Sequence, residues 1–156
     1  MAKAAVKSAA DTALVITRMF DAPLDRVYRA WSDVDEASKW LGPGDWRGTI
    51  KVSDMRPGNS YTIEMKHKDG DAVVATGIYR EVVKRERLVY TWAWLGEDGK
   101  PGPETLVTVT FRAVGKKTEI TLKHEGFLEK ESRDNHESGW NGCFDKLATY
   151  LQEENG

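Results

Sequence analysis

The 156-residue sequence predicts an α+β fold in which a curved antiparallel sheet of seven strands grips a long C-terminal helix. Two observations support this prediction. Residues 46–127 are apolar runs broken by turn signals such as RPGN, HKDGD and GEDGKPGP. Residues 129–154 then place apolar side chains at helical spacing. The expected order is one strand, two short helices, six strands and one long helix.

The first strand and the two short helices are expected before residue 46. The segment ALVITRMF, residues 13–20, is rich in β-branched and aromatic side chains, which favour strands. Pro23 then suits the first turn of a helix. A second helix is expected after an N-cap at Asp33, with Glu36 three residues later, and it stops at the sequence GPG.

The middle of the chain favours a meander of hairpins, because parallel strands would need crossover helices that this segment lacks. The terminal helix follows and presents one apolar stripe to the sheet. This arrangement leaves room for a hollow between sheet and helix. The stripe consists of Trp140, Cys143, Phe144, Leu147 and Leu151.

Two glycines fall within the terminal helix, where each costs about 1 kcal/mol relative to alanine. Gly139 lies at the edge of the apolar stripe, where a missing side chain lets the backbone approach the sheet or leaves space. The alternative is a kinked or loosely started helix at this position. Gly142 points almost opposite the stripe, so we expect it to make no room inside the fold.

Composition limits the possible partners. The 23 basic and 25 acidic residues are interspersed and give a net charge of −2, which offers no electrostatic footprint for nucleic acid or an anionic membrane. The single Cys143 allows no intrachain disulfide, which is compatible with the cytoplasm. The N-terminal stretch MAKAAVKSAADTALVI contains no continuous apolar run long enough for a signal peptide or a membrane span. We expect residues 1–12 to form a flexible arm and residues 13–156 a single domain.

Aromatic side chains gather on one face of the segment ERLVYTWAW. Alternation places Leu88, Tyr90, Trp92 and Trp94 together, on the face expected to be concave. Such residues pair a large apolar body with one polar group, so they can line a ligand cavity, or they can simply fill the core. Methionine and tyrosine side chains of the preceding strands can add adaptable lining, namely Met55, Tyr61 and Met65.

Two imidazoles are expected near the same hollow. His124 shares an inward face with Leu122, and His136 lies one turn before Trp140. Either can act as a general acid or base, orient a ligand, or serve only as a satisfied structural residue. Metal is not expected, because His136 and Cys143 are about two helical turns apart. No cofactor is expected either, since the sequence contains no glycine-rich phosphate loop, nucleophile elbow or paired-histidine motif.

The segment GDWRGT is expected at the mouth of the cavity. Trp46 would face the hollow, and the planar fork of Arg47 can clamp a carboxylate or phosphate. A surface ion pair between Asp45 and Arg47 explains the same residues more simply.

The order of segments resembles a known family. ITRMFDAPLDRVYRAWSD, KWLGP, GIYREVVKRERLVYTWAW, LVTVTFRAVGKKTEITLKHEGF and GWNGCFDKLATYL are similar to bacterial members of the activator of Hsp90 ATPase family, within the START-like or Bet v 1-like superfamily of helix-grip folds. The similarity spans residues 14–151 and implies a hydrophobic cavity under the C-terminal helix. Relatives in the superfamily bind lipids, sterols and polyketides, or act as enzymes.

The leading hypothesis is a protein that binds an apolar or aromatic small molecule in this cavity. One alternative, suggested by the resemblance alone, is a regulator of an Hsp90-type chaperone ATPase. Another is an enzyme that uses a cavity histidine for acid–base chemistry. The residues expected to contact the ligand are Trp31, Trp40, Trp46, Arg47, Tyr61, Tyr90, Trp92, His124, His136, Trp140 and Phe144.

Overall fold

The computed structural model describes residues 12–52 and 55–155, and it confirms the predicted order of elements. The helices in this part of the chain are α2 (Leu24–Ser32), α3 (Val34–Trp40) and α4 (Lys130–Asn155). The strands are β1 (Ala13–Phe20), β2 (Trp46–Val52), β3 (Ser60–His67), β4 (Ala72–Val83), β5 (Arg87–Trp94), β6 (Thr105–Val114) and β7 (Lys117–Glu125).

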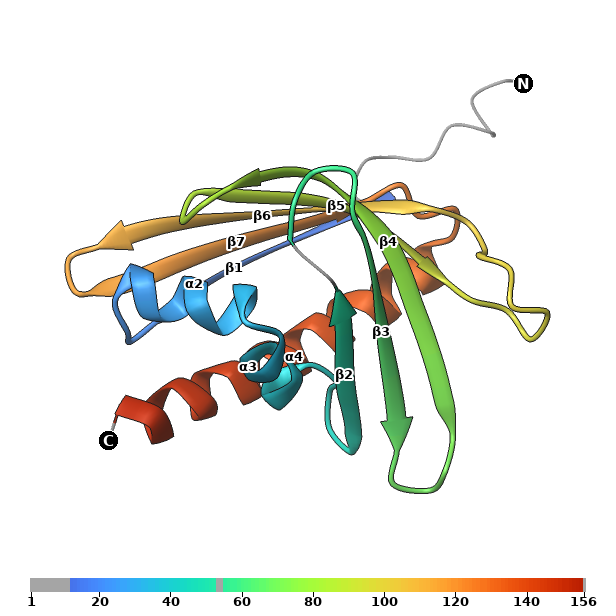
Figure 1. The fold of residues 1–156 in the computed structure, drawn as a ribbon, viewed down its shortest axis with the longest axis horizontal. Helices are drawn as coiled ribbons and strands as arrows, with labels where there is room; N and C mark the ends of the chain where they lie inside the picture. Colours follow the sequence, from blue (N-terminus) through green and yellow to red (C-terminus); the bar gives the residue numbers. More distant parts are fainter. Residues whose placement is uncertain (1–11, 53–54, 156) are drawn as a thin grey trace.

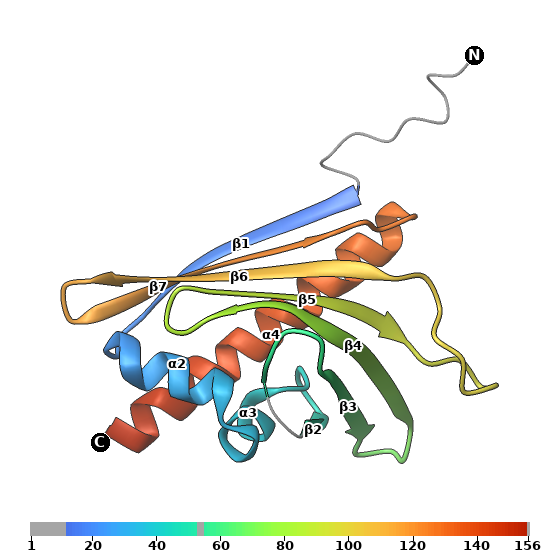
Figure 2. The same cartoon turned by 45° about the horizontal axis from the view of Figure 1, so that its top comes forward.

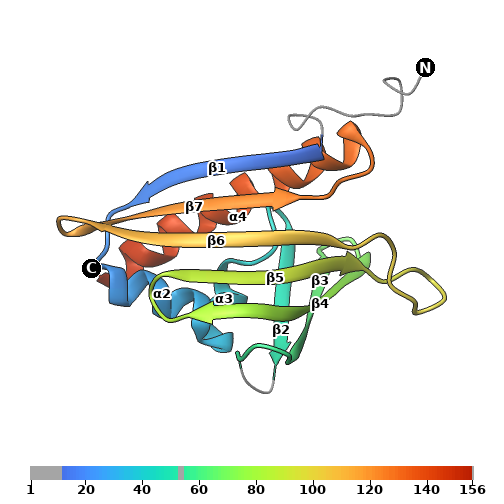
Figure 3. The same cartoon turned by 90° about the horizontal axis from the view of Figure 1, so that it is seen from above.

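All seven strands form one antiparallel sheet in the order β1-β7-β6-β5-β4-β3-β2. The six strands from β2 to β7 are the predicted meander, and β1 pairs with the last of them in a register that runs from Ala13 opposite Glu125 to Phe20 opposite Thr118. Figure 3 shows this succession from above, with β1 at one edge. The register of β4 and β5 shifts between Tyr79 and Glu81, at a bulge or irregularity in the ladder.

The two short helices form where the sequence places their boundaries. The carboxylate of Asp33 accepts hydrogen bonds from the backbone N–H groups of Asp35 (3.0 Å) and Glu36 (3.1 Å), so it is the predicted N-cap of α3. Pro23 is the N-cap of α2 and precedes the first turn by one residue. Gly42 follows α3 with φ at 92°, and a Cβ there would lie 2.8 Å from the Trp46 carbonyl oxygen.

The long helix α4 lies under the sheet, on the same side as α2 and α3 (Figures 1 and 2). It is continuous from residue 130 to residue 155, so neither Gly139 nor Gly142 breaks it. The whole predicted apolar stripe of α4 is buried: Trp140, Cys143, Phe144, Leu147 and Leu151.

Residues 1–11 of the expected N-terminal arm lie outside the described residues. Its last residue is tied to the fold, because the Thr12 carbonyl accepts hydrogen bonds from the backbone N–H groups of Gly126 and Phe127, each at 3.0 Å. Within the described ranges, no helix combines the length and the apolar character needed to cross a membrane.

Candidate functional site

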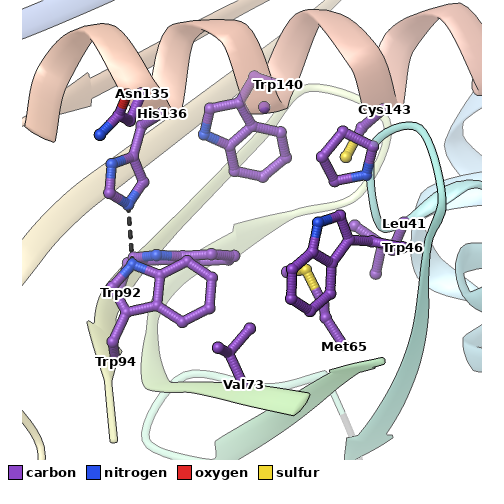
Figure 4. Close-up of a pocket in the computed structure, with 12 residues that line it drawn as sticks. Leu41, Trp46, Met65, Val73, Trp92, Trp94, Asn135, His136, Trp140 and Cys143 are labelled. Carbon is purple, nitrogen blue, oxygen red and sulfur yellow. Dashed lines mark hydrogen bonds between the residues drawn. The ribbon is translucent and has the colours of Figure 1, made fainter. Parts of the chain in front are cut away.

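A pocket of about 290 Å³ lies between the sheet and α4 (Figure 4). It is predominantly apolar and aromatic, and it reaches the surface beside Val73 and Asn135, which are both exposed. The loop between α3 and β2, four strands and α4 all contribute to its wall. The lining residues are Leu41, Pro43, Trp46, Met65, Val73, Trp92, Trp94, Asn135, His136, Gly139, Trp140 and Cys143.

The regular spacing of residues along β5 and α4 explains why several of their side chains point into the pocket. Trp92 and Trp94 are two residues apart on β5, so both point to the concave face of the sheet, as predicted. His136, Trp140 and Cys143 follow at spacings of four and three residues along α4, so they share the helix face that is turned toward the sheet.

The two glycines of α4 have different functions in the fold. A Cβ on Gly139 would meet only Pro43 Cγ, at 3.9 Å, so its missing side chain leaves space in the pocket. Of the two interpretations of Gly139, open space rather than a kinked helix is therefore the one that the structure supports. A Cβ on Gly142 would lie 2.6 Å from Pro43 Cβ and 3.3 Å from Pro43 Cα. The expectation that Gly142 makes no room was therefore wrong, because it allows the loop containing Pro43 to pack against the helix.

His136 is held at the pocket wall by two hydrogen bonds. The indole N–H of Trp94 donates to His136 Nε2 at 2.8 Å, as the dashed line in Figure 4 shows. The Ser132 carbonyl lies 2.7 Å from His136 Nδ1 and can only accept, so Nδ1 holds the ring proton. Burial lowers the pKa of His136, and the imidazole is neutral at pH 7.

His124 lies behind the pocket with the opposite tautomer. The indole N–H of Trp140 donates to His124 Nδ1 at 3.1 Å, which places the ring proton on Nε2, 2.6 Å from Thr105 Oγ1. The Thr105 hydroxyl in turn donates to the Trp92 carbonyl oxygen at 3.1 Å. Burial, with a further contribution from His136, lowers the pKa of His124 to about 3.

Two indole N–H groups have no partner. Among the buried side-chain polar atoms in the described part of the chain, only Trp31 Nε1 and Trp92 Nε1 lack a hydrogen bond. An unsatisfied buried donor costs roughly 1–3 kcal/mol. Trp92 belongs to the pocket wall, whereas Trp31 lines a separate, much smaller void in the interior.

The structure divides the single cavity expected from the sequence. Of the residues expected to contact the ligand, Trp46, Trp92, His136 and Trp140 line the pocket. The other predicted residues lie elsewhere in the fold. Trp31, Trp40, Tyr61 and Tyr90 surround a separate void of only about 30 Å³, His124 and Phe144 are fully buried and line neither space, and Arg47 lines a hollow on the outside.

Aromatic contacts explain the separation. The ring of Trp31 packs 4.8 Å from that of Trp40 and 5.9 Å from that of Phe111, measured between centroids. Tyr61 donates a hydrogen bond of 2.5 Å to the Thr91 carbonyl, which leaves its hydroxyl no free donor for a ligand. These side chains form the core of the domain.

Several lining residues were absent from the predicted contact set: Leu41, Pro43, Met65, Val73, Trp94, Asn135, Gly139 and Cys143. The sequence had already indicated Trp94 and Met65 as possible cavity lining, although neither was among the residues expected to contact the ligand. Pro43 gave no such signal, because GPG is typical of a turn.

Other chemistry at the pocket is limited. Burial raises the pKa of the Cys143 thiol to about 11, so the thiol is protonated at pH 7 and is a poor nucleophile. Within residues 12–52 and 55–155, no three His, Cys, Asp or Glu side chains come close enough to hold a metal ion.

A curved antiparallel sheet that grips a C-terminal helix, with a pocket between the two, defines a helix-grip protein. Residues 21–152 match the family model described as activator of Hsp90 ATPase homolog 1-like protein. The match covers most of the chain, and the chain therefore belongs to this family.

Solved structures share the fold. A protein from Chromobacterium violaceum is 27% identical, with a TM-score of 0.78 over 90% of this chain and 96% of that one. The AHSA1 protein from Silicibacter pomeroyi is 23% identical, with a TM-score of 0.84 over 91% and 99%. A protein from Arthrobacter aurescens is 21% identical, with a TM-score of 0.84 over 95% and 90%. Comparison with the curated proteins gives no significant match.

Proposed function

We propose that this chain is a cytoplasmic protein that binds a small aromatic or apolar molecule in the pocket under α4. The observation that supports this most strongly is the preformed space of about 290 Å³ with a predominantly apolar wall. Ligand pockets are typically concave, largely apolar and roughly 300–1,000 Å³ in volume. The cytoplasmic part of the proposal rests on the single cysteine of the sequence.

The shape and composition of the wall favour a compact ring system. Trp92, Trp94 and Trp140 offer ring faces and edges, and a favourable aromatic pair contributes about 0.5–1.5 kcal/mol beyond the burial of apolar area. The volume is at the small end of known ligand pockets, so it suits one to three fused rings better than a sterol.

The polar groups of the pocket wall favour a ligand that carries a hydrogen-bond acceptor. Trp94 and Trp140 already donate their indole N–H groups to histidines, whereas the N–H of Trp92 is unpaired. A ligand with one hydrogen-bond acceptor that reaches Trp92 would recover the cost of this unsatisfied donor. We therefore expect phenolic or carbonyl-bearing aromatics to bind more tightly than pure hydrocarbons.

The acid–base alternative receives less support from the geometry. Both ring nitrogens of His124 and of His136 are engaged in hydrogen bonds within the protein. A proton transfer at His136 would first have to break its bond to Trp94, and His124 does not line the pocket.

Tryptophan fluorescence provides the experiment, with naphthols, flavonoids, fatty acids and sterols as probes. Gly139→Leu fills the pocket from the helix side, so we expect it to abolish saturable binding of the aromatic probes. Ser138→Leu adds the same side chain at an exposed position of α4 and should leave binding unchanged. Equal affinity of both variants and the original chain would place the ligand outside the pocket.

A further inference from the structure

A second hollow, of about 550 Å³, lies between α3, the loop that follows it, β2 and α4, and it differs from the pocket in composition. The two spaces share Leu41, but most of the second wall is charged. Four basic side chains and one carboxylate line it, which gives an excess of three positive charges in a chain whose net charge is −2. The lining residues are Ser38, Lys39, Leu41, Gly44, Asp45, Arg47, Lys68 and Lys146.

Acidic side chains do not neutralise this excess. Among the residues that the structure describes, the only ion pair within the hollow joins Lys68 Nζ to Asp45 Oδ2 at 3.3 Å, and both side chains are largely exposed. Lys39 and Arg47 form no ion pair with any other residue that the structure describes. The simpler expectation of a surface pair between Asp45 and Arg47 was therefore wrong, and the guanidinium of Arg47 is available to an anion.

Lys146 is fixed at the inner wall of the hollow. Its ammonium donates to the Gly42 carbonyl at 2.5 Å and to the Trp46 carbonyl at 2.8 Å, which leaves one of its three N–H bonds for a further acceptor. Burial, together with repulsion from Arg47, lowers the pKa of Lys146. An anion placed in the hollow would relieve that repulsion.

We propose that this hollow binds the dianionic phosphate group of a small phosphate monoester. The planar fork of Arg47 can form two parallel hydrogen bonds to a phosphate, and the ammonium groups of Lys39 and Lys146 add point charges. A doubly charged group matches the excess of three positive charges better than a single carboxylate does. The volume exceeds that of a phosphate ion and leaves space for the organic part of the ligand.

Backbone amide shifts in ¹⁵N NMR spectra test this proposal at constant ionic strength. The probes are inorganic phosphate, glycerol 3-phosphate and adenosine 5′-monophosphate, with succinate as a dicarboxylate of equal charge. We expect saturable shifts of the amides of Gly44, Asp45 and Arg47 with at least one monoester. The monoester that binds more tightly identifies the organic part that the hollow accepts.

Variants on one strand provide the matched comparison. Arg47→Gln removes the guanidinium, and we expect about tenfold weaker binding of the monoester. Lys51→Gln makes the same change of charge four residues further along β2, outside the hollow, and should have no effect. Shifts that do not saturate, equal losses in both variants, or succinate binding as tightly as the monoesters would overturn the proposal. The result of this NMR test does not depend on whether the apolar pocket binds a ligand, because that binding is measured separately by tryptophan fluorescence.

Discussion

The indole N–H of Trp94 donates a hydrogen bond of 2.8 Å to His136 Nε2 at the wall of the apolar pocket. This bond requires an unprotonated Nε2, so it stabilises the neutral imidazole. Trp94→Phe retains an aromatic ring and removes the donor. We expect the pKa of His136 to rise from its lowered value toward 6.5, as measured by NMR titration of the ring protons.

Trp46→Phe is the control for this prediction, because Trp46 lines the same pocket and packs against His67, with 5.0 Å between ring centroids. The pKa of His136 should be unchanged in that variant. An equal rise in both variants would show that the change comes from general loosening of the pocket.

The buried His124 makes the stability of the fold depend on pH. Burial lowers its pKa from 6.5 to about 3, so between these values the unfolded chain binds a proton that the folded chain excludes. The contribution of His124 to stability is therefore complete above pH 6.5 and is lost as the pH falls toward 3. Urea unfolding of the original chain and of His124→Gln, each measured from pH 7 to pH 4, tests this sign.

We expect the free energy of unfolding to fall more steeply with decreasing pH in the original chain than in His124→Gln. Carboxylates also titrate in this range, but they contribute equally to both proteins and cancel in the difference. Parallel curves would contradict the assignment of a neutral, buried His124.

Replacing glycine by alanine is expected to have opposite effects on stability at positions 142 and 139 of α4, because only Gly142 is in close contact with Pro43. Gly142→Ala gains about 1 kcal/mol of helix propensity but places a Cβ 2.6 Å from Pro43 Cβ, so we expect a net loss of stability. Gly139→Ala gains the same propensity without a close contact, and it should raise the melting temperature. Thermal unfolding measures both, and a higher melting temperature for Gly142→Ala would refute the close packing of Gly142 against Pro43.

Glu36 joins three helices through polar contacts. Its carboxylate accepts hydrogen bonds from Arg26 at 2.7 Å, Arg29 at 2.8 Å and the Tyr150 hydroxyl at 2.8 Å. The Arg26 side chain is only 10% exposed, so Glu36→Ala leaves a nearly buried charge unpaired. We expect a loss of about 3 kcal/mol in the free energy of unfolding, measured with urea.

An exposed ion pair provides the comparison for Glu36. Asp25 and Arg85 are 2.9 Å apart, and their side chains are 78% and 50% exposed. Asp25→Ala should cost no more than about 1 kcal/mol. Comparable losses in the two variants would mean that burial does not determine how much these ion pairs contribute to the free energy of unfolding.

The sequence predicted most of the fold, because the relevant signals are local. Alternation over residues 88–94 identified the concave face of β5, and Asp33 has the side chain that caps a helix in any context. The family resemblance pointed to the same architecture. The contact of Gly142 with Pro43 was out of reach, since it depends on where a loop 99 residues earlier in the chain crosses α4.

The site was predicted less completely for two physical reasons. Periodicity tells which way a side chain points but not whether neighbours fill the space, so Trp31 and Trp40 were expected in a cavity that they in fact close. Trp46 and Arg47 were both expected at one mouth, although adjacent strand residues point to opposite faces. That rule alone would have assigned Arg47 to a different surface.

The location of a bound ligand tests the central claim most directly. We propose a crystal structure of the chain with the tightest aromatic probe from the fluorescence titration. We expect ordered density for the probe between Trp46, Trp92 and Trp140, beneath α4. A pocket without density, with the probe bound on the outer surface of the sheet, would contradict it.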